Sequence, residues 1–76
     1  MGRMMQRPLD TLRSNIGKRV IVTLRMGREY RGILDGYDPH MNIVLKQSEE
    51  YIDGSKGGSA NIQIIRGDNV VYISPP

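Results

Sequence analysis

Apolar residues recur with helical spacing at the start of the chain and with a period of two after it. The apolar positions that share one helical face are Leu9, Leu12 and Ile16. Pro8 suits a first helical position and Gly17 suits a stop, so the spacing predicts an amphipathic helix over residues 8–16. A helix of this length is marginal in isolation, and it must therefore dock on the elements that follow.

The alternation after the helix predicts five short strands. These are residues 19–26, 29–37, 41–47, 61–65 and 70–73, with the third bending on toward residues 51–52. Gly27-Arg28 predicts a type II′ turn between the first two strands, which makes them antiparallel. Residues 53–59 form a flexible polar loop in this interpretation, and residues 66–69 form a tight turn for which Gly67 supplies the backbone angles.

Two glycines inside the second predicted strand indicate how the sheet is shaped. Gly32 and Gly36 weaken a flat strand, and they are expected where a strand bends sharply and a small sheet closes on itself. The fold class that follows is mainly β, with a short N-terminal helix before a strongly bent, five-stranded antiparallel SH3-like barrel. No internal repeat or linker divides the chain, so residues 1–76 are expected to form one domain.

Size and composition narrow the ways in which such a domain can be stable. The chain has 76 residues, no cysteine and a single histidine, so neither a disulfide nor a zinc site can staple it, and we expect no metal and no cofactor. Oligomerisation is therefore the remaining way to stabilise a domain of this size. No apolar run approaches the roughly 20 residues of a membrane span, and no secretory signal is evident, so we expect an intracellular, cytoplasmic protein.

Charge and reactive residues argue against catalysis. Eleven basic against eight acidic residues give 11 − 8 = +3, a mild bias toward polyanions. His40 has no nucleophile beside it in sequence, and the aspartates occupy turns and strand ends. Residues 54–59 lack the ending and the following helix of a phosphate-binding loop. The sequence predicts a binding protein and no enzyme.

Two polar turn segments are more informative together than apart. They are Asp38-Pro39-His40-Met41-Asn42, between the second and third strands, and Arg66-Gly67-Asp68-Asn69, between the fourth and fifth. With the apolar residues that flank them, their order and separation resemble the two-part signature of the Sm and Sm-like proteins. In that comparison the first motif covers residues 18–47, the variable loop residues 53–59 and the second motif residues 60–74, and the chain looks like an archaeal-type member.

The resemblance implies an assembly and a ligand. Strands four and five of neighbouring subunits would pair edge to edge into a homo-oligomeric ring, most often of seven subunits. The ring would bind single-stranded, U-rich RNA in base pockets around its pore. It would act as an RNA chaperone or scaffold in processing or decay, with other RNA-processing proteins as possible partners and no membrane.

The resemblance also implies roles for single residues. His40 and Arg66 would stack on the two faces of a base, and Asn42 would read the Watson–Crick edge of uracil. A carboxylate must orient the amide of Asn42; Asp68 or Asp38 could do this, and the resemblance favours Asp68, with Asp38 as a turn and network residue. Gly67 would let backbone approach the ligand. Possible secondary RNA contacts on the helix side are Tyr37, Arg3 and Arg7, and Met41 is expected to pack in the interior.

Other functions stay open on the residues alone. An SH3-like barrel could serve as a protein–protein interaction scaffold without base-specific RNA binding, although four scattered tyrosines form a poor aromatic groove. A small hydrolase is the third class, and it would need a base and usually a metal.

Overall fold

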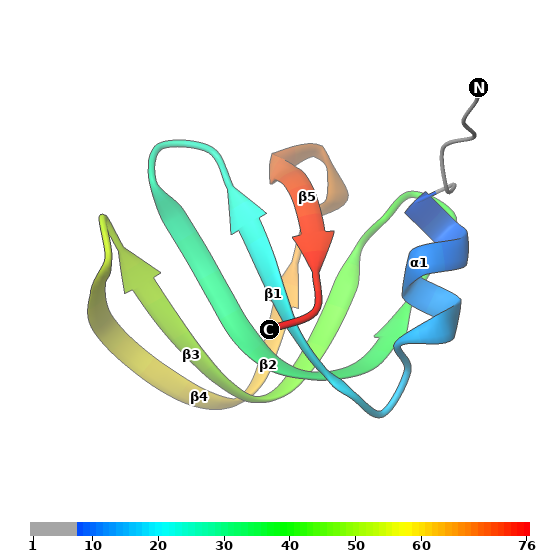
Figure 1. The fold of residues 1–76 in the computed structure, drawn as a ribbon, viewed down its shortest axis with the longest axis horizontal. Helices are drawn as coiled ribbons and strands as arrows, with labels where there is room; N and C mark the ends of the chain where they lie inside the picture. The colour runs from blue at the N-terminus through cyan, green and yellow to red at the C-terminus, as the bar shows by residue number, and fades with distance from the viewer. Residues whose placement is uncertain (1–7) are drawn as a thin grey trace.

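The computed structural model describes residues 8–76, which form one helix and a five-stranded sheet (Figure 1). The elements are α1 (Pro8–Ser14), β1 (Arg19–Leu24), β2 (Arg28–Tyr37), β3 (Ile43–Ile52), β4 (Ser55–Ile65), a 3-10 turn η1 (Gly67–Asn69) and β5 (Val70–Ser74). The predicted mainly β class, with a short helix ahead of five antiparallel strands, is confirmed. Within residues 8–76 no helix is long and apolar enough to cross a membrane.

The strands are arranged in the order β4-β3-β2-β1-β5, and every neighbouring pair is antiparallel. The sheet curls strongly on itself, with α1 at one end (Figure 1). Strands β4 and β5 are the two edges and do not pair with each other, so the sheet curls without closing. Exposed apolar side chains gather on these edges; they are Ile62, Ile64, Val71 and Tyr72.

The core lies inside the curl of the sheet and beneath the helix. Its buried apolar side chains are Leu12, Val20, Val22, Leu24, Leu34, Ile43, Leu45 and Ile65. The alternation of β1 explains three of them, since every second residue of this strand faces the core. Leu12 is the contribution of α1 and is fully buried, which docks the short helix on the sheet.

The helix ends two residues earlier than the spacing of apolar residues predicts. Asn15 closes the last turn: its backbone N–H donates to Leu12 O over 3.1 Å and its side-chain amide donates to Thr11 O over 2.7 Å. These bonds satisfy carbonyl groups that a continuing helix would use. Ile16 therefore lies outside the helix and is 46% exposed.

The turn between β1 and β2 differs from the predicted type II′ turn by one residue. Met26 and Gly27 have φ angles of 66° and 73°, and positive φ at both central positions is the requirement of a type I′ turn. Strand β1 consequently ends at Leu24, and β2 begins at Arg28.

The predicted flexible loop over residues 53–59 is wrong for most of its length. Asp53 and Gly54 alone make the turn, with φ angles of 50° and 86°, and β4 begins at Ser55. Asp-Gly is a preferred type I′ pair, and it sets the register that aligns the following polar residues with β3. One cross-strand ion pair, Lys56 to Glu49 at 3.0 Å, forms in this extension.

The glycines of β2 mark the bends, as predicted. The register of β2 with β3 shifts between Arg31 and Ile33 and again between Leu34 and Gly36. A Cβ atom at Gly32 would lie 2.9 Å from the Lys46 carbonyl oxygen, so the strands approach too closely for a larger residue. Strand β3 begins at Ile43, two residues after its predicted start, because Met41 adopts a φ of 66° in the preceding turn.

Candidate functional site

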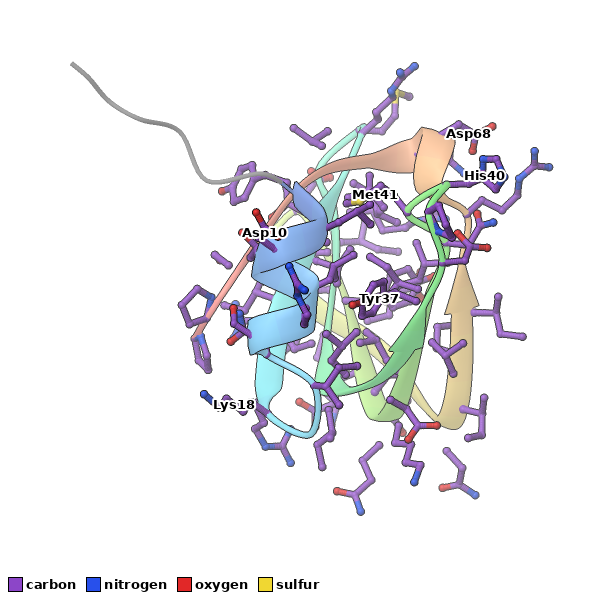
Figure 2. The ribbon with its side chains drawn as sticks, turned by 90° about the vertical axis from the view of Figure 1, so that its right-hand side faces the viewer. Asp10, Lys18, Tyr37, His40, Met41 and Asp68 are labelled. Atoms are coloured by element: carbon purple, nitrogen blue, oxygen red, sulfur yellow. The ribbon has the colours of Figure 1, made fainter. Side chains whose placement is uncertain are left out.

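Two turns from distant parts of the chain meet at one corner of the molecule. They are the β2–β3 turn, residues 38–42, and the β4–β5 turn, residues 66–69. The backbone N–H of Gly67 donates to the side-chain oxygen Oδ1 of Asn42 over 2.8 Å. Figure 2 shows His40 and Asp68, one from each turn, side by side at this corner. The two segments that the sequence singles out are therefore adjacent.

Asp38 organises the β2–β3 turn. Its Oδ1 accepts the backbone N–H groups of His40, at 2.8 Å, and of Asn42, at 3.1 Å, in the manner of an Asx turn. Its Oδ2 accepts the side-chain Nδ2 of Asn42 at 2.9 Å. These bonds favour the ionised carboxylate, and they hold the pKa of Asp38 below its ordinary value, with the Asn42 side-chain bond the largest cause.

The amide of Asn42 is thereby fixed at both of its ends. Nδ2 donates to Asp38 and Oδ1 accepts from Gly67, so the oxygen and the nitrogen cannot exchange places without losing two bonds. An amide has two lone pairs and two N–H hydrogens. One of each remains available for a planar group that offers a donor beside an acceptor.

Gly67 allows the two turns to come together. A Cβ atom at this position would collide with the carbonyl oxygen of His40 and would lie 2.8 Å from the carbonyl carbon of Met41. The φ of Gly67 is not among the positive values, so the predicted need for unusual backbone angles is wrong. Close approach of two backbones is the reason for glycine here.

The expected partner of Asn42, Asp68, instead lies beside Arg66. Asp68 Oδ2 accepts from the Arg66 guanidinium at 3.3 Å, and both side chains are largely exposed. The role of orienting Asn42 falls to Asp38. The guanidinium of Arg66 keeps an open face, which is suited to stacking on a planar ligand.

An open depression of about 740 Å³ lies against the site. Its lining includes Asn42, Arg66 and Tyr37, together with the apolar side chains of Val44 and Ile64. His40 is exposed and is not part of this lining. Tyr37 is partly buried against the core, and Met41 packs there too, as expected (Figure 2).

Two residues predicted as secondary RNA contacts are not placed by the structure. Arg3 and Arg7 lie outside the described residues. Among residues 8–76, no group of three His, Asp or Glu side chains could hold a metal ion. The anchoring role of Asp38 could have been inferred from its spacing, since an aspartate two residues before His40 and four before Asn42 suits an Asx turn.

Comparisons with known proteins agree with this architecture. The model of the LSM domain matches residues 10–75. A putative snRNP Sm-like protein of Methanococcoides burtonii is 52% identical over 69 residues, which cover 91% of this chain and 96% of the relative.

Two solved structures are similar in fold and sequence. The Sm protein of Pyrococcus abyssii, solved in complex with a uridine heptamer, is 45% identical with a TM-score of 0.88, and the match covers 93% of this chain and all of the other. The SmAP1 heptamer of P. aerophilum is 41% identical with a TM-score of 0.82, over 96% and 97% of the two chains. A match of this extent, together with the paired turns, shows that the chain belongs to the LSM family of Sm-like proteins.

Proposed function

We propose that this protein forms a homo-heptameric ring that binds single-stranded, U-rich RNA, one base in the pocket of each subunit. The Asn42 amide, fixed by Asp38 and Gly67, is the observation that carries the proposal. The relatives that were solved as a heptamer and with a uridine heptamer support the assembly and the ligand.

The fixed amide accounts for a preference for uracil. The free lone pair of Oδ1 accepts from uracil N3–H, and the free hydrogen of Nδ2 donates to O4. Cytosine offers an acceptor at N3 and a donor at N4, so it would require the opposite orientation of the amide. Turning the amide over would break its bonds to Asp38 and Gly67.

Stacking on the base and the repetition of identical pockets around the ring supply the rest of the affinity for RNA. His40 and Arg66 lie on the two turns and would cover the two faces of the base, with Arg66 adding a cation–π contribution. Asp68 would hold Arg66 in place through the 3.3 Å contact. A ring presents identical pockets to one strand, which raises the effective concentration for each successive base.

The ring would use the two free edges of the sheet. Pairing β5 of one subunit with β4 of the next satisfies their backbone groups and covers the exposed apolar side chains there. On the helix side, Tyr37 with Arg3 and Arg7 would offer a secondary RNA contact. The protein would act in the cytoplasm as a chaperone or scaffold for RNA processing or decay, alongside other RNA-processing proteins and without catalysis.

Fluorescence anisotropy of labelled oligo-U and oligo-C, of about ten nucleotides each, tests the proposal. Wild type, Asn42→Ala and the control Gln47→Asn are titrated at two salt concentrations. Gln47 is an exposed amide on the interior strand β3, and asparagine tolerates its positive φ. We expect wild type and the control to bind oligo-U more tightly than oligo-C. Asn42→Ala should abolish the difference and keep the salt dependence, which comes from phosphate contacts.

Two outcomes contradict the proposal. Equal affinity of wild type for the two oligomers would remove the assigned base pocket. Cleavage of labelled RNA in the presence of Mg²⁺, lost in His40→Ala, would replace a binding function with a nuclease.

A further inference from the structure

A second hollow, of about 370 Å³, lies where the β1–β2 turn, the end of β3 and the end of η1 come together. We name it the turn-end hollow; its lining residues are Leu24, Arg25, Met26, Arg28, Ile52 and Asn69. The β1–β2 turn and the β4–β5 turn lie at the same end of the molecule in both views (Figures 1 and 2).

Strand pairing builds this hollow. Leu24 pairs with Val70 and Arg28 pairs with Ile52, so the ends of two strand pairs form its floor. The backbone N–H of Asp53 donates to Gly27 O over 2.9 Å and ties the two neighbouring hairpin turns together. The 3-10 turn η1 lies between the hollow and the candidate base site: its last residue, Asn69, lines the hollow, and its first residue, Gly67, donates to Asn42.

The chemistry of the hollow combines apolar surface with cationic groups. Met26 and Ile52 are exposed, at 92% and 41%. Arg25 has no ion pair among residues 8–76, whereas Arg28 lies 3.4 Å from Glu50. A guanidinium beside an apolar surface suits a ligand with a flat ring and an anionic group.

Met26 occupies a conformation that its own residue type does not favour. A φ of 66° in a type I′ turn is ordinarily supplied by Asn, Asp or Gly. Within residues 8–76 the Met26 side chain is 92% exposed, so it makes too little packing contact to compensate. An exposed methionine at a strained position is understandable when its side chain contacts a ligand.

We propose that the turn-end hollow binds a second nucleotide of the same single-stranded RNA, with the base on Met26 and Ile52 and a phosphate at Arg25. This inference rests on the proposed function and extends the RNA path beyond the Asn42 pocket. The side-chain amide of Asn69 has no hydrogen bond within residues 8–76 that fixes its orientation, so this subsite accepts any base. Only the three residues of η1 separate Asn69 in the hollow from the Gly67 contact to Asn42, and this proximity to the base pocket favours RNA over an acidic peptide.

Anisotropy titrations with oligo-U and oligo-C about twenty nucleotides long test the subsite, because they are long enough to occupy both positions. The variants are Arg25→Gln, Met26→Asn, Asn42→Ala and the charge-matched control Lys18→Gln, whose side chain lies at the opposite end from His40 (Figure 2). We expect Arg25→Gln to weaken both oligomers about threefold to tenfold and to lower the salt slope, while Lys18→Gln leaves both unchanged.

Met26→Asn separates a ligand contact from a structural role. Asparagine suits the positive φ, so this variant should unfold at a higher temperature than wild type and yet bind both oligomers about threefold more weakly. Unchanged RNA affinity of Arg25→Gln and Met26→Asn, relative to Lys18→Gln, would overturn the subsite. Arg25-dependent binding of polyglutamate without any effect on RNA would also overturn it, in favour of an acidic protein partner.

The two proposals fail in different ways in this experiment. Failure of the base pocket appears as an Asn42→Ala variant that keeps the wild-type preference between oligo-U and oligo-C. Failure of the turn-end hollow appears as an Arg25→Gln variant that behaves as the control does. Absence of RNA binding by wild type would overturn both.

Discussion

The β2–β3 turn and the β1–β2 turn differ in how firmly hydrogen bonds fix their side chains. In the β2–β3 turn the Asp38 carboxylate accepts three N–H groups, and Asn42 is bonded at both ends of its amide. The β1–β2 turn closes on a long 3.5 Å bond from Arg28 N–H to Arg25 O, and its Arg25 and Met26 side chains point into solvent. A fixed amide can discriminate between bases, whereas free cationic and apolar groups can only attract them.

Disrupting the contact between the β2–β3 turn and the β4–β5 turn should have the largest effect on stability. Gly67→Ala should destabilise the protein by about 1–3 kcal/mol, because its Cβ cannot fit against His40 and Met41. Gly58→Ala is the matched control, since no atom lies within 4 Å of its new Cβ, and it should stay within about 0.5 kcal/mol. Chemical denaturation measures both, and equal stabilities would show that the turns can separate freely.

Asp38 in the β2–β3 turn and Asp68 in the β4–β5 turn should differ in their effect on the preference between oligo-U and oligo-C. Asp38→Ala leaves the amide of Asn42 free to turn over, so the affinities for oligo-U and oligo-C should converge and the melting temperature should fall. Asp68→Ala removes only an exposed contact to Arg66, worth at most about 1 kcal/mol, and should keep the preference for oligo-U. The reverse result in paired titrations would return the orienting role to Asp68.

Acid should erase the contribution of Asp38. A carboxyl group whose pKa is lowered by folding stabilises the folded state above its unfolded pKa, and this stabilisation is lost as the pH falls through the folded pKa. The melting temperatures of wild type and Asp38→Asn should therefore differ by a constant amount from neutral pH down to about pH 5 and converge below about pH 4. A difference that persists in acid would contradict an ionised anchor.

The smallest effect is expected at the β1–β2 turn. Arg28→Gln removes the partly exposed 3.4 Å contact with Glu50, which keeps its 2.9 Å hydrogen bond from the Tyr30 hydroxyl. The cost should lie within about 0.5 kcal/mol. A larger loss of stability in thermal denaturation would show that side-chain contacts fix this turn as firmly as the β2–β3 turn.

Most of the fold follows from spacing that can be counted in the sequence. The period of two places Val20, Val22 and Leu24 in the core, and the glycines of β2 mark the bends. The errors concern turns, because a positive φ at Met26 and the extension of β4 through residues 55–59 depend on pairing with a neighbouring strand. Local composition favours a loop there, and tertiary contacts override it.

The site was predictable as a pair of turns but not as a set of hydrogen bonds. Residue types and their order indicate that residues 38–42 and 66–69 belong together. Either Asp38 or Asp68 could reach Asn42 on sequence alone, and only the geometry of the β2–β3 turn decides between them. A glycine at position 67 predicts either unusual backbone angles or a close approach to a ligand, whereas the structure uses the absence of a side chain where two backbones cross.

The open edges of the sheet have a consequence for how copies of this chain would be counted in solution. A chain of subunits joined through β4 and β5 has one free β4 edge and one free β5 edge whatever its length, since each addition covers one edge and supplies another. Only the subunit that closes the ring removes both. Each addition before closure forms one interface and costs the freedom of a separate subunit, whereas closure forms a further interface within one assembly. The population should therefore divide between single subunits and complete rings.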